Sequence, residues 1–138
     1  MAAAHFNEMV VSKLVEGALS CFEAHGIPED DVLVVWTPGA FELPLVAKRL
    51  AESELYDALV CLGAVIRGET AHFEYVAGET AAGITRAGLD TGVPVIFGVL
   101  TVDDREQALD RLGGKEGHKG EEAALTAIEM ASLLRGLP

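Results

Sequence analysis

The sequence predicts an α/β fold, a three-layer sandwich in which helices flank both faces of a four-stranded parallel sheet. Three observations lead to this prediction. Continuous apolar runs typical of strands buried on both faces alternate with segments whose apolar residues recur at helical spacing. The alternation ends on two helices, and right-handed crossovers would make the strands parallel. No internal repeat, linker or low-complexity segment interrupts the 138 residues, so we expect one domain over residues 1–138.

The individual elements follow from the same periods and from local start and stop signals. Strands are expected over residues 1–6, 32–36, 59–66 and 93–100, and helices over residues 11–22, 43–51, 70–89 and 121–134. Pro44 is tolerated in the first turn of its helix. Asp103 or Asp104 can cap a further short helix that ends at Leu112.

The composition excludes several classes of protein. Half of the residues are apolar and 23% are charged, which argues against disorder. A net charge of -12 argues against nucleic-acid binding, and no uncharged run reaches the roughly 18 residues of a membrane helix. Cys21 and Cys61 form no CxxC pair and lie in apolar segments, so we expect buried free thiols. With no basic start typical of a signal peptide, a cytoplasmic location is expected.

A glycine-bounded turn after the third expected strand carries the most suggestive chemistry. The segment Gly63–Phe73 ends an apolar run and brings Thr70 and His72 to the start of a helix. Histidine suits proton transfer near neutral pH. A lone histidine at a helix start is more often structural than catalytic, so position alone leaves both roles open. No two histidines stand at a metal-ligand spacing, so no metal is expected. Phosphate-loop and dinucleotide motifs are absent, which argues against nucleotide binding, and no serine elbow indicates a hydrolase.

A second unusual segment is basic within an acidic chain. Arg111, Lys115 and Lys119 fall four residues apart among four glycines, which disfavour a regular helix. We therefore expect a flexible basic loop over residues 111–120 that suits a small anionic ligand.

The fold rule gathers these segments, because ligands of open parallel sheets bind beyond the carboxyl ends of the strands. The loops expected there begin at Phe6, Thr37, Arg67 and just after Phe97. Phe6 could belong to the core or serve as a stacking platform for a ring. Residues 39–42 could be an ordinary turn or could bind polyol hydroxyls through backbone N–H groups and the Glu42 carboxylate.

Four motifs then occur in order: Pro38–Pro44, Gly63–Val76, Phe97–Thr101 and the basic segment 111–120. Together they resemble the motifs of the lumazine synthase family, and the similarity extends over essentially the whole chain. The resemblance implies a flavodoxin-like sheet and an enzyme of riboflavin biosynthesis. Its reaction condenses 5-amino-6-(D-ribitylamino)uracil with 3,4-dihydroxy-2-butanone 4-phosphate to 6,7-dimethyl-8-ribityllumazine and releases phosphate. No cofactor or metal takes part.

The resemblance also implies a role for each matching residue. His72 would move protons. The substrate-binding residues would be Phe6, which stacks on the pyrimidine; Ala40, Phe41 and Glu42, which hold the ribityl chain; Ala64, Val65 and Ile66 at the ring edge; Glu69, Thr70, Arg111 and Lys119 around the phosphate; and Phe97 from a neighbouring subunit. Arg67 would be a structural partner instead.

Two departures from the family pattern stand out. His118 replaces the asparagine that is common before Lys119, which could alter the loop or its response to pH. The first strand is expected to be truncated or half-length, because family members begin it several residues earlier.

The resemblance further implies a homo-pentamer that can extend to a decamer or a sixty-subunit icosahedral shell, with riboflavin synthase as a partner. Two other functions stay open: a module that binds a ribityl compound without converting it, and a structural container. The combination of His72 with Arg111 favours the enzyme, because neither alternative needs a proton-transfer group beside a phosphate clamp.

Overall fold

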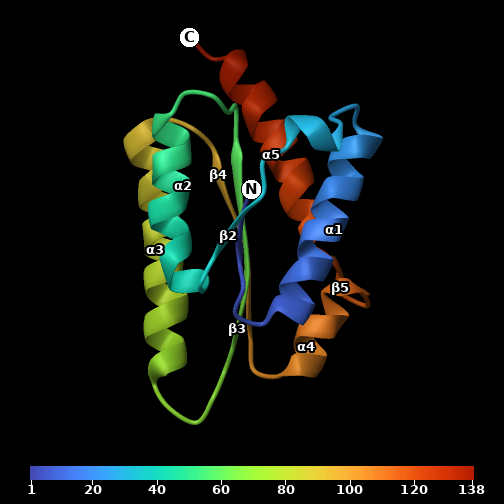
Figure 1. Cartoon of the computed structure of the whole chain (residues 1–138), viewed down its shortest axis with the longest axis vertical. Coiled ribbons are helices and arrows are strands. Elements are labelled where there is room, and N and C mark those ends of the chain that lie inside the picture. Colours follow the sequence, from blue (N-terminus) through green and yellow to red (C-terminus); the bar gives the residue numbers. More distant parts are fainter.

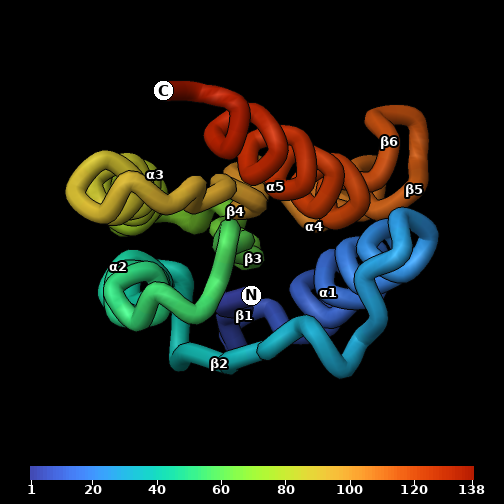
Figure 2. The backbone as a smooth tube through the Cα atoms, turned by 90° about the horizontal axis from the view of Figure 1, so that it is seen from above, coloured from blue at the N-terminus to red at the C-terminus, as the bar shows by residue number.

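A computed structural model describes all residues, 1–138, and contains one main sheet between two layers of helices. Its strands are β1 (Ala2–Ala4), β2 (Val35–Thr37), β3 (Leu59–Ile66) and β4 (Val95–Val102). One helical layer contains α2 (Leu43–Glu52) and α3 (His72–Thr91), and the other contains α1 (Glu8–Ala24), α4 (Arg105–Asp110) and α5 (Lys119–Arg135). Figures 1 and 2 show these layers from the side and from above. The α/β sandwich expected from the sequence is confirmed.

The four strands are all parallel and lie in the order β2-β1-β3-β4. Strands β3 and β4 pair along their full length, from Leu59 opposite Val95 to Ile66 opposite Val102. Strand β1 is central although it has only three residues. The backbone N–H groups of His5 and Phe6 extend its contacts by donating to the carbonyls of Thr37 and Pro38 at 2.8 and 3.1 Å.

Strand β2 differs from the expected one. The sequence predicted a strand over residues 32–36 that is buried on both faces, whereas β2 covers Val35–Thr37 at the edge of the sheet and is partly exposed. Its only neighbour is β1, which offers Ala2, Ala3 and Ala4 as partners. Residues 32–34 therefore have no paired strand, although Val32 and Val34 are β-branched.

The core lies on both faces of the sheet, because β3 alternates its side chains between them. Val60 and Leu62 join the apolar cluster under α1 and α5, while Cys61 joins the cluster under α2 and α3. Cys61 is fully buried and free, and its burial raises the pKa of the thiol to about 12. The prediction that β3 is buried on both faces is confirmed.

Helices α1 and α5 pack backbone to backbone. A Cβ atom on Gly120 would lie 2.2 Å from the carbonyl oxygen of Leu14, so only glycine allows this approach. The two helices run side by side on one face of the sheet (Figure 2).

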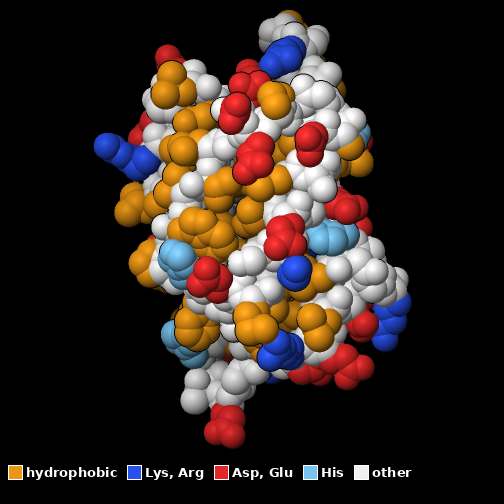
Figure 3. Space-filling view, turned by 45° about the vertical axis from the view of Figure 1, so that its right-hand side comes forward, with side chains coloured by type: hydrophobic (Ala, Val, Ile, Leu, Met, Phe, Trp, Pro, Cys, Tyr) orange, Lys and Arg blue, Asp and Glu red, His pale blue; other side chains and the backbone are white.

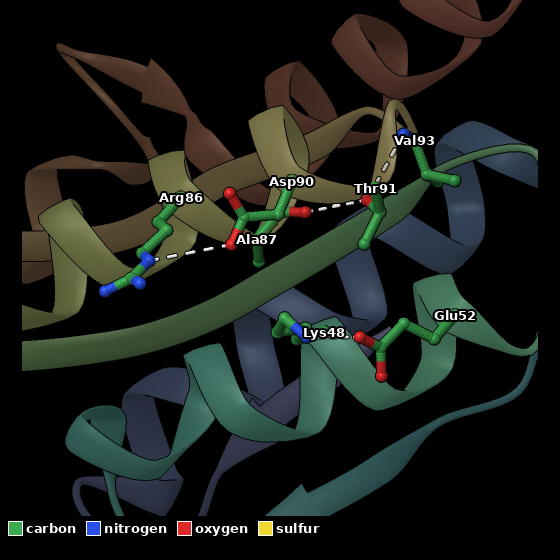
Figure 4. A network of polar contacts seen from close by, with 7 residues as sticks. All are labelled: Lys48, Glu52, Arg86, Ala87, Asp90, Thr91 and Val93. Carbon is green, nitrogen blue, oxygen red and sulfur yellow. Dashed lines mark hydrogen bonds and ion pairs between the residues drawn. The ribbon is translucent and has the colours of Figure 1, made fainter.

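Helix α3 begins near the carboxyl ends of the strands and ends at the other edge of the sheet. Polar groups form hydrogen bonds at its last turn (Figure 4). The Thr91 hydroxyl donates to the carbonyl of Ala87 at 2.7 Å and accepts from the N–H of Val93 at 3.3 Å. Gly92 follows in the left-handed conformation at φ 72° and turns the chain into β4. None of the helices combines the length and hydropathy needed to cross a membrane.

The basic segment 111–120 is more ordered than expected. Instead of a flexible loop it contains a small antiparallel pair, β5 (Leu112–Gly114) and β6 (Gly117–His118). Gly113 and Gly117 adopt φ values of 96° and 76°, which let the chain reverse tightly.

The boundaries of β4 and of four helices also differ from the predicted ones. Strand β4 covers Val95–Val102 rather than residues 93–100, and α1 covers Glu8–Ala24 rather than residues 11–22. Helix α3 begins at His72 rather than residue 70, and α5 begins at Lys119 rather than residue 121. Helix α4 ends at Asp110 rather than Leu112. Asp104, and not Asp103, provides its cap by accepting from the N–H of Gln107 at 2.8 Å.

Candidate active site

A cavity of about 640 Å³ lies beyond the carboxyl ends of β1, β2 and β3. It is lined by most of the predicted site residues and by several others: Phe6, Asn7, Gly39, Ala40, Phe41, Glu42, Ala64, Val65, Ile66, Gly68, Thr70, His72, Phe73, Tyr75 and Val76. Three loops that are far apart in the sequence thus share one pocket at the edge where the fold rule expects a ligand.

The first wall of the cavity comes from the end of β1. Asn7 adopts a left-handed conformation at φ 62° and donates from Nδ2 to the carbonyl of Ala64 at 2.8 Å. This bond joins the chain after β1 to β3. The ring of Phe6 is 73% exposed, so it is a surface of the cavity rather than part of the core.

The second wall is the short turn between β2 and α2. The Thr37 hydroxyl donates to the carbonyl of Gly39 at 2.8 Å and holds the start of the turn. Ala40 is buried beneath it, while Phe41 and Glu42 are exposed toward solvent. The Glu42 carboxylate folds back over the turn, because its Oε2 would lie 3.1 Å from a Cβ atom on Gly39. Hydroxyl groups of a ligand could bond to this carboxylate.

The third wall is the turn that joins β3 to α3. Arg67 bonds to the carboxylates of Glu74 and Asp103, the latter at 2.9 Å, and lies over the Phe73 ring at 4.2 Å from its centre. These bonds raise the pKa of Arg67, and Arg67 in turn lowers the pKa of Glu74. Arg67 is therefore engaged within the chain and braces the turn, as expected of a structural partner.

His72 is the first residue of α3 and lines the cavity. The Thr70 hydroxyl accepts from its backbone N–H at 3.4 Å. The imidazole is exposed and forms no hydrogen bond within the chain, so it is free to exchange protons with a ligand.

The predicted phosphate residues do not all lie in this cavity. Arg111, Lys119 and Phe97 line a separate cavity of about 500 Å³ beside β4 and α5. Glu69 lines neither of the two. Because β4 pairs only with β3, this second cavity lies at an open edge of the sheet, and Phe97 is 43% exposed there.

Arg111 is the least neutralised of the three basic residues in its segment. Lys115 forms an ion pair with Asp110 at 3.2 Å, and Lys119 forms one with Glu122 at 2.7 Å. Arg111 donates from Nη1 to the carbonyl of Gln107 at 2.9 Å and has no carboxylate partner. Its guanidinium is thus best placed to bind an anion.

Comparison with known protein families decides between the open alternatives. The family model described as 6,7-dimethyl-8-ribityllumazine synthase matches residues 1–135 of the chain. The chain belongs to the 6,7-dimethyl-8-ribityllumazine synthase family. Members of this family are transferases of riboflavin biosynthesis that act on small-molecule substrates, so the chain is an enzyme.

The structure shows cavity residues that the sequence analysis did not single out. Asn7 joins two walls, and Tyr75 and Val76 line the cavity one turn along α3 from His72. Helical spacing from His72 could have indicated these two residues. No group of three or more His, Cys, Asp or Glu side chains is arranged to hold a metal ion.

Proposed function

We propose that the chain condenses 5-amino-6-(D-ribitylamino)uracil with 3,4-dihydroxy-2-butanone 4-phosphate, and acts as a single domain over residues 1–138. The products are 6,7-dimethyl-8-ribityllumazine, inorganic phosphate and two molecules of water. The observation that carries the proposal is the cavity in which the exposed imidazole of His72 lies with the aromatic ring of Phe6 and the turn that contains Glu42. The family match supports the same reaction.

The ribitylaminouracil would occupy the larger cavity. Phe6 stacks on its pyrimidine ring, and backbone groups of Ala64, Val65 and Ile66 contact the edge of that ring. The turn that contains Ala40, Phe41 and Glu42 binds the ribityl hydroxyls through backbone groups and a carboxylate.

The butanone phosphate would lie beside the turn before α3. Its phosphate accepts bonds from the backbone of Glu69 and from the Thr70 hydroxyl. Arg111 and Lys119 supply positive charge. This charge stabilises the phosphate as it leaves.

His72 serves the proton transfers. The amine of one substrate attacks the carbonyl of the other and water is lost, phosphate is eliminated, and a second amine closes the ring with loss of the second water. Each step moves a proton, for which an imidazole contributes about 10²–10⁴-fold. Holding both substrates together supplies much of the rest.

The proposal includes a site shared between copies of the chain. Arg111, Lys119 and Phe97 line a cavity that has no lining residue in common with the His72 cavity. A second copy that brings its β4 edge against the first would unite them. This revises the expectation that Phe97 alone comes from a neighbour.

Exposed apolar side chains support such an assembly. Phe6, Met9, Tyr75 and Phe97 are all well exposed. Hydrophobic side chains form a band down the middle of the face in Figure 3, between acidic ones. We propose a homo-pentamer that can extend to a decamer or a sixty-subunit shell and that contacts riboflavin synthase. The two free cysteines support a cytoplasmic location.

The test mixes the purified protein with both substrates and follows lumazine fluorescence. We expect product from the parent chain, a kcat about 10²-fold lower for His72→Ala, and a raised KM for the phosphate substrate in Arg111→Ala. Lys115→Ala is the matched control, because Lys115 is exposed and lines neither cavity. Binding without product would support a binding module instead. Undiminished turnover in both variants would refute the residue roles.

A further inference from the structure

His118 lies where three elements meet. It is the last residue of β6 and the N-cap of α5, and its Nδ1 accepts from the backbone N–H groups of Gly120 and Glu121 at 3.2 and 3.4 Å. Its ring fills a space on α1 that only glycine leaves open, since a Cβ atom on Gly17 would lie 2.1 Å from Cε1. Helix α5 therefore starts at an imidazole that is held from both sides.

The same junction fixes the backbone of both basic residues in the second cavity. His118 pairs with Leu112 across the β5–β6 hairpin, next to Arg111. The backbone N–H of Lys119 donates to the carbonyl of Arg111 at 2.9 Å. Loss of the cap would loosen both residues together.

The cap requires an unprotonated Nδ1. Protonation would remove both bonds and would put a positive charge at a helix N-terminus, which already carries partial positive charge. The charged and titratable side chains on the surrounding elements are Glu8, Lys13, Glu16, Cys21 and Glu23 of α1, Arg105, Glu106 and Asp110 of α4, Arg111, Lys115 and Glu116 around the hairpin, and Lys119, Glu121, Glu122, Glu129 and Arg135 of α5.

No ion pair with a carboxylate offsets a charge on the ring. Three of the carboxylates are paired with lysines instead: Glu16 with Lys13 at 3.1 Å, Asp110 with Lys115, and Glu122 with Lys119. None forms an ion pair with the imidazole. Acidification therefore acts against the cap.

We propose that His118 is a positioning residue that holds Arg111 and Lys119 for the substrate phosphate only while its imidazole is neutral. Histidine changes charge between about pH 5 and 8. The phosphate site is thus formed at the upper end of this range and is weakened as the pH falls. This inference rests on the proposed function for its substrate.

The test compares how KM for the butanone phosphate changes from pH 8 to pH 5.5 in the parent chain and in His118→Asn. Asparagine is a strong N-cap that does not titrate. The two proteins differ only at residue 118 and meet the same substrate, so the effects of pH on every other group cancel in the comparison. We expect the parent KM to rise about fivefold more than that of the variant, the factor that corresponds to one lost cap. His118→Ala should show the raised KM already at pH 8. Equal pH dependence in the parent and His118→Asn would overturn the proposal.

Amide hydrogen exchange of residues 111–122 supplies a readout that does not need activity. After correction for the intrinsic effect of pH, protection at Gly120 and Glu121 should fall on acidification in the parent and persist in His118→Asn. Unchanged protection in the parent would overturn the proposal even if the enzyme is active. A parent chain without product would refute the proposed function, while the exchange result would still decide the role of His118.

Discussion

Two substitutions of Asn7 should destabilise the protein to different extents, because Asn7 combines a left-handed backbone with a side chain that donates a hydrogen bond to Ala64. Asn7→Gly keeps the conformation free of strain but loses the bond, which is worth about 1 kcal/mol. The greater conformational entropy of glycine also stabilises the unfolded chain by roughly 0.5–1 kcal/mol. Asn7→Ala loses the same bond and adds about 1–2 kcal/mol of left-handed strain. We expect losses of about 1.5–2 kcal/mol for Asn7→Gly and about 2–3 kcal/mol for Asn7→Ala.

Glu54 offers a matched control. It is the other non-glycine residue with positive φ, at 60°, and its side chain forms no hydrogen bond within the chain. Glu54→Gly should therefore leave stability unchanged or raise it, since glycine removes the strain and no bond is lost.

Urea unfolding at one protein concentration measures these differences, and KM for the ribitylaminouracil should rise in both Asn7 variants. Equal stability of Asn7→Ala and Asn7→Gly would refute the argument from backbone strain. A neutral Asn7→Gly would refute the argument from the bond to Ala64.

Two further predictions concern buried groups. The Thr80 hydroxyl is fully buried without a hydrogen-bond partner, so Thr80→Val should stabilise the protein by about 1–2 kcal/mol in urea unfolding. Thr85→Val is the control and should bring no gain, because the Thr85 hydroxyl is exposed and donates to the carbonyl of Ala81 at 2.9 Å; an equal gain in both would contradict the explanation. Burial raises the pKa of Cys61 to about 12, so a thiol reagent at pH 8 should modify Cys61 only after unfolding. Rapid modification of Cys61 in the native protein would show that the strand is not buried as described.

The parts of the fold that were predictable are those in which local pattern and burial agree. Strand β3 is a run of apolar residues long enough to be covered on both faces, and its bounds match the prediction at both ends. Helix α2 likewise combines Pro44 at its start with one apolar face.

The remaining errors depend on neighbours that are distant in sequence. The extent of β2 is set by the three residues of β1, which no pattern in residues 32–36 reveals. The hairpin in the basic segment depends on two glycines with positive φ, and the start of α5 depends on the ring of His118 acting as a cap.

The residues of the candidate site could be predicted, but their division between two separate cavities could not. Strand ends brought His72, Phe6 and Glu42 to one edge, as the fold rule requires. That Arg111 lies in a different cavity follows only from the path of the chain after β4.

The most direct test of the shared site is complementation between two impaired variants. His72→Ala and Arg111→Ala chains are co-expressed, and mixed assemblies are isolated with two different tags. If each site joins the His72 cavity of one copy to the Arg111 cavity of the next, about a quarter of the interfaces in a random assembly combine two intact halves. At a butanone phosphate concentration far below the KM of Arg111→Ala, we predict a turnover near that fraction of the parent value, far above either variant alone. A mixed assembly no more active than the average of the His72→Ala and Arg111→Ala variants would contradict the account.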